Sequence, residues 1–230
     1  MSIADRILYE DNHLIIVNKL AGEIVQGDKT GDVPLVDAVK DYLKVTYNKP
    51  GNVFCGLVHR IDRPVSGAVI FAKTSKALAR MNEIVKQREI SKTYLAIVEK
   101  APEIPEQRLT DWLFRNEKLN KTFVSHTEKV GYVKAELSYR VVRTLTNYTL
   151  LEVELYTGRH HQIRAQLSAN GTVIKGDLKY GARRSNSDGS ISLHSYKVAF
   201  DHPVSHKSVS VTAPLSGEMA KILGDDFQTL

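Results

Sequence analysis

One carboxylate stands between two guanidinium groups in the segment 59–67, where Asp62 is flanked by Arg60 and Arg63. A carboxylate beside arginines stays ionised at neutral pH, which suits a nucleophile or a base better than a proton donor. Pro64 holds the preceding residue extended and Ser66-Gly67 predicts a turn, so we expect a rigid connecting loop that presents Asp62. A solvated salt-bridge loop on the surface would have the same composition, and this pattern alone leaves both interpretations open.

A second basic group follows an apolar stretch, at Thr157-Gly158-Arg159. The spacing over 160–170 predicts a helix on which His160 and Arg164 lie one turn apart on the same face. Such a helix start would bind a phosphate. Alternatively, Arg164 would reach the Asp62 carboxylate, because a planar guanidinium group can donate two parallel hydrogen bonds to a carboxylate. A solvated basic face is the alternative.

Tyr94 begins an alternating strand over 91–99 and shares a face with Ala96 and Val98. An aromatic ring at this position is either a core residue or a platform for a flipped base. An enzyme that modifies a base within folded RNA must extrude the nucleotide, and stacking on an aromatic ring contributes roughly 1–3 kcal/mol per base.

Several other chemistries have no support in the sequence. The chain has no His-Glu-x-x-His or Cys-x-x-Cys motif, and His160 and His161 are expected on different helix faces, so we predict no metal site. Neither a phosphate-binding loop nor Gly-x-Gly-x-x-Gly occurs, and Gly-x-Ser-x-Gly is absent, which argues against a nucleotide cofactor and serine hydrolysis.

Composition indicates a soluble protein that meets polyanions. The 230 residues include 32 Lys+Arg and 26 Asp+Glu, giving a net charge of +6. The single cysteine excludes an internal disulfide and favours a reducing cytoplasm. We expect no targeting or membrane segment, and 230 residues allow one large domain or two small lobes.

The elements that must position these residues follow from hydrophobic periodicity and turn signals. We expect helices over 34–46, 75–87, 160–170 and 215–223, and an exposed basic hairpin or arm over 115–121. The expected strands are 7–9, 14–17, 68–72, 91–99, 135–142, 148–156, 192–200 and 208–212.

Taken together, the motifs resemble those of the RluA family of pseudouridine synthases, which act on ribosomal and transfer RNA. Residues 59–62 with Ser66-Gly67 are similar to the family signature His-Arg-Leu-Asp-x-x-Thr-Ser-Gly. Further similar motifs follow in the family's order and spacing, at Lys92–Ala96, Thr157–Arg164, Lys175–Gly181 and Leu193-His194. The likeness runs from Ile7 to about Pro214.

The resemblance implies an α+β fold, with a mixed, mostly antiparallel bent sheet, flanking helices and a central cleft with Asp62 at its floor. It implies one catalytic domain over 1–230, with two sub-lobes around that cleft and without the accessory RNA-binding domain that many relatives carry in front. We expect no cofactor and no metal, RNA (rRNA or tRNA) as partner, no membrane association, and a cytoplasmic monomer.

The resemblance also implies residue roles. Asp62 would be the catalytic carboxylate, Tyr94 the ring on the uracil, and Arg164 the partner that orients Asp62. Arg60 would help to displace the flipped nucleotide, and Leu193 would lie under the target base. The remaining substrate contacts are expected at His59, Arg63, Arg159, His161 and Gln162.

The implied reaction cleaves the glycosidic bond of uridine, rotates the uracil and rejoins it to the sugar through ring carbon 5. Whether the carboxylate attacks the sugar, attacks the base or abstracts a sugar proton stays open. The chain departs from the family pattern at Leu20, Pro64-Val65 and Gln166. Two rival functions are a catalytically silent RNA-binding or chaperone protein and a glycosidase-like hydrolase, although no second carboxyl group accompanies Asp62 in its motif.

Overall fold

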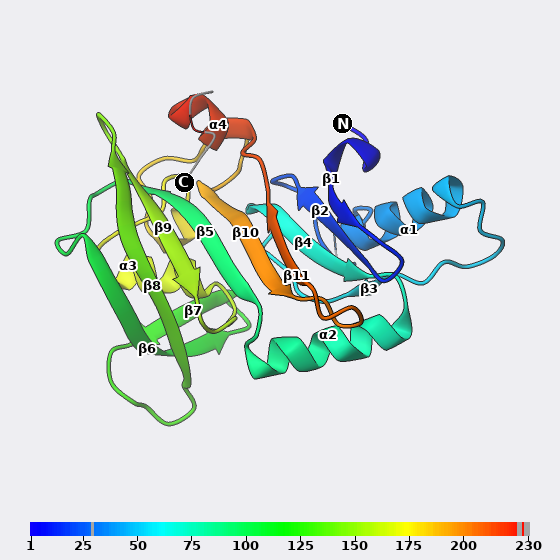
Figure 1. Cartoon of the computed structure of the whole chain (residues 1–230). Helices are drawn as coiled ribbons and strands as arrows, with labels where there is room; N and C mark the ends of the chain where they lie inside the picture. The colour runs from blue at the N-terminus through cyan, green and yellow to red at the C-terminus, as the bar shows by residue number, and fades with distance from the viewer. Residues whose placement is uncertain (29, 225–226, 228–230) are drawn as a thin grey trace. The chain divides into compact units, whose positions relative to one another are not determined.

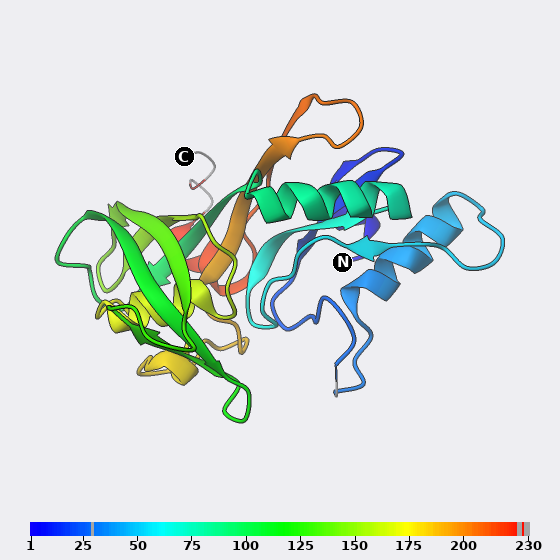
Figure 2. The same cartoon turned by 90° about the horizontal axis from the view of Figure 1, so that it is seen from below.

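The computed structural model describes residues 1–28, 30–224 and 227. The chain divides into two compact units, which we describe separately (Figures 1 and 2). Unit 1 comprises Met1–Ile90 and Ser195–Ser216, and unit 2 comprises Ser91–His194 and Gly217–Leu230. The division falls within strand β10 (Leu193–Asp201), so both units are built from segments that are distant in sequence.

Unit 1 is built on two strands whose residues are all buried, β2 (Leu14–Lys19) and β4 (Ser66–Ala72), which pair antiparallel. Strands buried on both faces read as continuous apolar runs, as these do. A short helix, η1 (Ala4–Arg6), precedes the first strand. The other strands of unit 1 all pair antiparallel: β1 (Ile7–Glu10) pairs with β2, β3 (Gly56–Leu57) pairs with β4, and β11 (Ser208–Thr212) pairs with β10.

Two amphipathic helices supply the rest of the unit 1 core. Helix α1 (Leu35–Thr46) buries Leu35, Val39 and Leu43 at helical spacing. Helix α2 (Ser75–Gln87) starts at Thr74, whose hydroxyl accepts a hydrogen bond from the Ala77 amide. Ala77 and Met81 of α2 pack into the apolar cluster between this helix and the strands. Figure 2 shows the helix lying across the strands of unit 1.

Unit 2 contains an antiparallel sheet in the order β5-β9-β8-β6-β7. Burial alternates along β6 and β8, because one face of the sheet is covered and the other is solvated. Helix α3 (Gln162–Ala169) contacts β6 and β7. The remaining bounds are β5 (Ser91–Val98), β6 (Glu106–Asn116), β7 (Lys121–Ser125), β8 (Val133–Thr144), β9 (Thr149–Leu155), η2 (Leu178–Tyr180) and α4 (Gly217–Leu223).

The predicted α+β class is confirmed, and each predicted helix and strand has a counterpart. The turn predicted at Ser66-Gly67 is wrong, because both residues belong to β4, where Gly67 pairs with Lys19. Gly67 has φ +114°, and a Cβ on it would lie 2.3 Å from the Ser195 carbonyl oxygen. The glycine is therefore required for close approach of two backbones and not for a turn.

The helix predicted over 160–170 is shorter, because it begins at Gln162. His161 has the left-handed φ of 51°, which interrupts helical geometry immediately before α3. His160 and Arg164 therefore do not share a helix face. Among the described residues, no helix is both long and apolar enough to span a membrane.

Candidate active site

The Asp62 loop is anchored by its apolar residues and presents its charged ones. Ile61 and Val65 are buried, whereas Arg60 and Arg63 are exposed and Asp62 is half-buried. The Val65 amide donates to the Asp62 carbonyl over 3.0 Å and closes a tight turn. The loop is thus fixed by its backbone and its buried apolar side chains, while both arginines stay exposed.

Lys19 holds this loop from below, a role that the sequence reasoning missed. Its side chain is fully buried, and Nζ donates to the carbonyls of Leu20, Arg63 and Val65 at 2.9, 3.0 and 2.7 Å. Burial lowers the pKa of Lys19 to about 7, against the opposing charges of Glu23 and Asp62. The available signal was a lysine at the end of the apolar run Leu14–Val17.

Two neighbours of Asp62 also have defined partners. The Ile70 amide donates to His59 Nε2 over 3.2 Å, so this ring nitrogen acts as a hydrogen-bond acceptor. Arg63 pairs with Asp32 at 2.7 Å, but both side chains are about half exposed. The first contact fixes the start of the loop, and the second leaves Arg63 accessible to solvent.

In unit 2, Tyr94 and Leu193 are both nearly buried, at 6% and 3% exposure. Their strands are tied together by the backbone, because the Ile97 amide donates to the Ser192 carbonyl and the Ser192 amide donates to the Lys175 carbonyl, both over 2.9 Å. The start of β10 is thereby fixed against β5.

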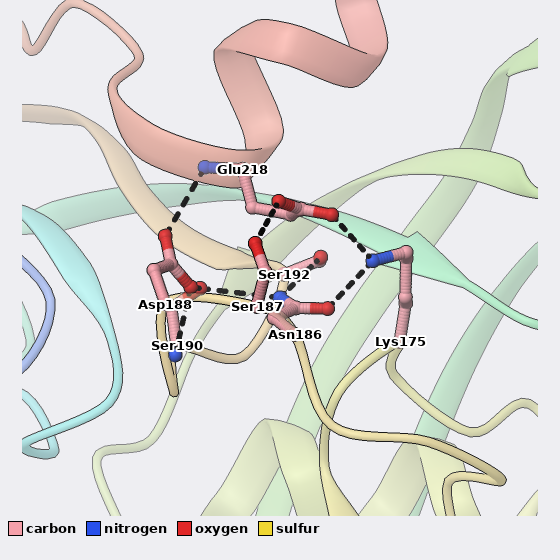
Figure 3. Close-up of polar contacts among 7 residues, drawn as sticks. All are labelled: Lys175, Asn186, Ser187, Asp188, Ser190, Ser192 and Glu218. Carbon is pink, nitrogen blue, oxygen red and sulfur yellow. Dashed lines mark hydrogen bonds and ion pairs between the residues drawn. The ribbon is translucent and has the colours of Figure 1, made fainter.

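A polar cluster fixes the segment that leads to Leu193 (Figure 3). Lys175 Nζ lies 2.6 Å from Asn186 Oδ1 and 3.1 Å from Glu218 Oε1, which links this segment to α4. The Asn186 amide group donates to the hydroxyls of Ser190 and Ser192. The cluster therefore determines the backbone position immediately before Leu193.

Arg164 is held by a buried carboxylate within unit 2. Its Nε and Nη2 donate to the two oxygens of Asp177 at 2.7 and 2.9 Å, and the two side chains are 5% and 1% exposed. The guanidinium carbon also lies 5.1 Å from the centre of the Tyr180 ring. This paired geometry fixes the plane of the guanidinium group.

The two histidines before α3 stack on each other, with ring centres 3.8 Å apart. The expectation that they point to different helix faces is wrong, because neither lies within the helix. His160 Nδ1 lies 2.9 Å from the Thr122 hydroxyl, and His161 Nδ1 lies 2.9 Å from the Tyr180 hydroxyl. Burial, followed by the charge of Arg164, lowers the pKa of His161 to about 2, so it stays neutral.

Gln162 holds the turn that precedes α3. Its Oε1 accepts from the Thr157 hydroxyl and the Arg159 amide, and its Nε2 donates to the Glu136 carbonyl. Gln162 is 3% exposed, whereas the Arg159 side chain is exposed. Of these two predicted substrate contacts, Arg159 is accessible and Gln162 positions it.

The predicted site residues thus fall into two groups, one in each unit. Asp62 lies with His59, Arg60 and Arg63 in unit 1, and the other group lies in unit 2. The predicted pairing of Arg164 with Asp62 joins residues of different units and stays a prediction. The unit 2 group consists of Tyr94, Arg159, His161, Gln162, Arg164 and Leu193.

Comparison with known proteins identifies the family. Residues 13–169 match the model of the RNA pseudouridylate synthase family. The chain belongs to this family. It is 31% identical over 221 residues to the ribosomal large subunit pseudouridine synthase C of Buchnera aphidicola subsp. Acyrthosiphon pisum, covering 93% of this chain and 68% of the relative. It is also 31% identical to the ribosomal large subunit pseudouridine synthase D of Zymomonas mobilis, and this match covers 93% of this chain and 70% of the relative.

Solved structures show the same fold. Human RNA pseudouridylate synthase domain containing 4 superimposes with a TM-score of 0.80 at 20% identity, over 96% of this chain and 92% of the human chain. Human RNA pseudouridylate synthase domain containing 1 superimposes with a TM-score of 0.71 at 21% identity, over 91% of this chain and 83% of the human chain. The predicted family and pseudouridine synthase fold are confirmed. The protein is an isomerase that converts uridine in RNA to pseudouridine.

Proposed function

We propose that this synthase modifies uridines of large-subunit ribosomal RNA and uses Asp62 as its catalytic carboxylate. The main support is the Asp62 loop, in which Lys19 and the turn fix the backbone while Asp62 and both arginines stay at or near the surface. The proposed RNA follows from the names of the relatives, which are ribosomal large subunit synthases.

The chemistry requires a positioned, ionised carboxylate and no bound oxidant. The bond from C1′ to uracil N1 breaks, a bond from C1′ to C5 forms, N1 gains a proton and C5 loses one to solvent. Asp62 acts as nucleophile or base in each route. A loop fixed by its backbone lowers the entropic cost of presenting the carboxylate to the nucleotide.

We assign the nucleotide contacts as follows. The Tyr94 ring stacks on the uracil and Leu193 lies under it, which would account for the defined backbone around both residues. Arg164 orients Asp62, because Asp177 occupies one edge of the guanidinium and a planar guanidinium has further N–H donors. Arg60, exposed in the loop, displaces the flipped nucleotide.

A basic region of unit 2 supports binding of the RNA backbone. Lys179 Nζ donates to the Asn120 carbonyl at the β6–β7 turn, and Lys121 lies over the Tyr180 ring. Arg115 and Lys179 both contribute to the lowered pKa of His161, which shows that their positive field reaches this turn. With Lys118 and Arg159, these side chains form a surface for phosphate contacts.

The decisive experiment measures release of tritium from C5 of labelled uridine in RNA taken from cells that lack the protein. We expect Asp62→Asn to lower the rate by at least about 100-fold. Asp41→Asn, which removes an exposed carboxylate from α1, is the matched control and should retain parental activity. An Asp62→Asn rate equal to the parent would exclude Asp62 as the catalytic carboxylate.

The choice of RNA is tested by mapping pseudouridine in ribosomal and transfer RNA with and without the protein. We expect the sites that are lost to lie in large-subunit ribosomal RNA, and losses confined to transfer RNA would contradict this. We further propose that the enzyme works as a cytoplasmic monomer. Light scattering of the active fraction should give a mass near 25.8 kDa.

A further inference from the structure

Lys92 differs from the other lysines that are largely buried. Lys19 donates to backbone carbonyls, Lys73 pairs with Glu10 at 2.6 Å, and Lys175 pairs with Glu218 at 3.1 Å. Lys92 is only partly accessible, yet within the described residues it has neither a hydrogen bond nor an ion pair. Burial lowers its pKa, and no carboxylate opposes this shift.

The position of Lys92 connects it with the proposed uracil site. It precedes Tyr94 by two residues on β5, and alternation along a strand places the two side chains on the same face, roughly 7 Å apart. Its ammonium group lies beside Gly158, where a Cβ would be 3.8 Å from Nζ. Gly158 is exposed and lies in the turn held by Gln162, so the ammonium group is at an edge that solvent reaches.

An unpaired, partly buried ammonium group lowers stability, since it loses hydration without gaining a partner. Such a cost is commonly compensated when a ligand supplies the missing charge. The ligand should be anionic, because the ammonium group has only donors. A phosphate is the strongest anionic acceptor on an RNA whose uracil would lie on the neighbouring Tyr94 ring.

We propose that Lys92 binds a backbone phosphate beside the target uridine and so fixes the nucleotide whose uracil stacks on Tyr94. This inference rests on the proposed function of Tyr94 and deepens it. Lys92 is then a substrate-binding residue that adds to those expected from the sequence. Its partial burial strengthens the contact, because the surrounding protein screens charge less than water does.

The test measures kcat/KM for tritium release over a range of salt concentrations, with labelled RNA from cells that lack the protein. Losing one phosphate contact should reduce the slope of log(kcat/KM) against log[salt] by about 0.7 in Lys92→Gln. We expect KM to rise about 10-fold at physiological salt, as expected for loss of a hydrogen-bonded charge. Lys86→Gln is the matched control, because it removes the same charge from the exposed face of α2.

A second measurement separates binding from a structural role. Because Lys92 has no partner in the described residues, Lys92→Gln and Lys92→Met should melt at or above the parental temperature. A lower melting temperature, an unchanged salt slope, or a change no larger than that of Lys86→Gln would each overturn the proposal. An inactive parent would instead overturn the proposed function, so the two failures are distinguishable.

Discussion

The supports of Asp62 and Arg164 differ in kind. Under the Asp62 loop, the cation of Lys19 donates its hydrogen bonds to backbone carbonyls. Beside α3, the carboxylate of Asp177 binds the Arg164 side chain itself through two hydrogen bonds. The first arrangement fixes a stretch of chain, and the second fixes a functional group.

Under the proposed function, the two supports prepare Asp62 and Arg164 for different roles. The Asp62 carboxylate is carried by a fixed backbone, which suits a group that is to be presented to the reacting nucleotide. The Arg164 guanidinium has a fixed plane, which suits an orienting partner. Disrupting either support should therefore lower activity, but with different consequences for stability and pH dependence.

The largest effect is expected from Asp177→Ala. Removing one partner of a buried ion pair leaves the Arg164 charge uncompensated, which should cost about 3–5 kcal/mol in the free energy of unfolding. Asp177→Asn should cost less but still lower kcat more than it raises KM, because the guanidinium loses its fixed plane. Urea denaturation and steady-state kinetics measure the two effects.

Glu128→Ala, which removes an exposed carboxylate from the same unit, is the control and should be neutral. Parental kcat in a folded Asp177→Asn protein would show that Asp177 does not position Arg164.

Lys19→Met is expected to have the next largest effect. The substitution keeps the length of the side chain but leaves buried carbonyls without donors, which should cost about 3 kcal/mol. The Asp62 loop would lose its support, so kcat should fall even where the protein is still folded. Thermal unfolding and tritium release are the measurements, with Lys86→Met as an exposed control. Retention of both properties would refute the supporting role.

The stability of the protein should depend on pH through Lys19 but not through the Arg164–Asp177 pair. The pKa of Lys19 is about 7 in the folded state, below its ordinary value of 10.5, so the native state binds fewer protons than the unfolded state between these values. The unfavourable contribution of Lys19 is therefore fully present below pH 7 and disappears as pH rises toward 10. Stability of the parent should rise relative to Lys19→Met over this window.

Equilibrium unfolding of both proteins at several pH values measures this difference. The Arg164–Asp177 pair serves as the comparison: the stability difference between the parent and Asp177→Asn should stay constant over this window, because both proteins keep Lys19. A constant difference between the parent and Lys19→Met would contradict the lowered pKa.

The smallest effect is expected from Asp32→Asn. Asp32 pairs directly with Arg63 at the surface, and both side chains are about half exposed, so the stability change should stay below about 0.5 kcal/mol. Removing this partner frees Arg63 for phosphate, so KM should change little or fall slightly. A large loss of stability by thermal unfolding would show that this surface pair supports the loop as Lys19 does.

The loop at Asp62 shows where local sequence reasoning succeeded and where it failed. The rigid connection and the following strand were predicted from Pro64 and the apolar run 68–72. The role of Gly67 was not, because its requirement comes from the backbone of Ser195, more than a hundred residues away. A turn signal and a close-approach glycine look alike in a sequence.

The same limit applies to α3. Helical spacing predicted its existence, but the left-handed conformation of His161 depends on the stacked His160 ring and on the Tyr180 hydroxyl. The Tyr180 hydroxyl comes from another segment, so periodicity did not reveal where the helix begins. Lys19 was missed for a related reason, since its carbonyl partners belong largely to the Asp62 loop.

By itself, the sequence determined the family, the α+β class, the approximate position of each element and the candidate catalytic residues, because local periodicity and contiguous motifs encode them. Tertiary structure alone decided that Lys19 supports the Asp62 loop, that Asp177 fixes Arg164 and that Lys92 has no partner among the described residues. These facts depend on which distant carbonyls and carboxylates reach each charge, and only the folded chain brings them within hydrogen-bonding distance.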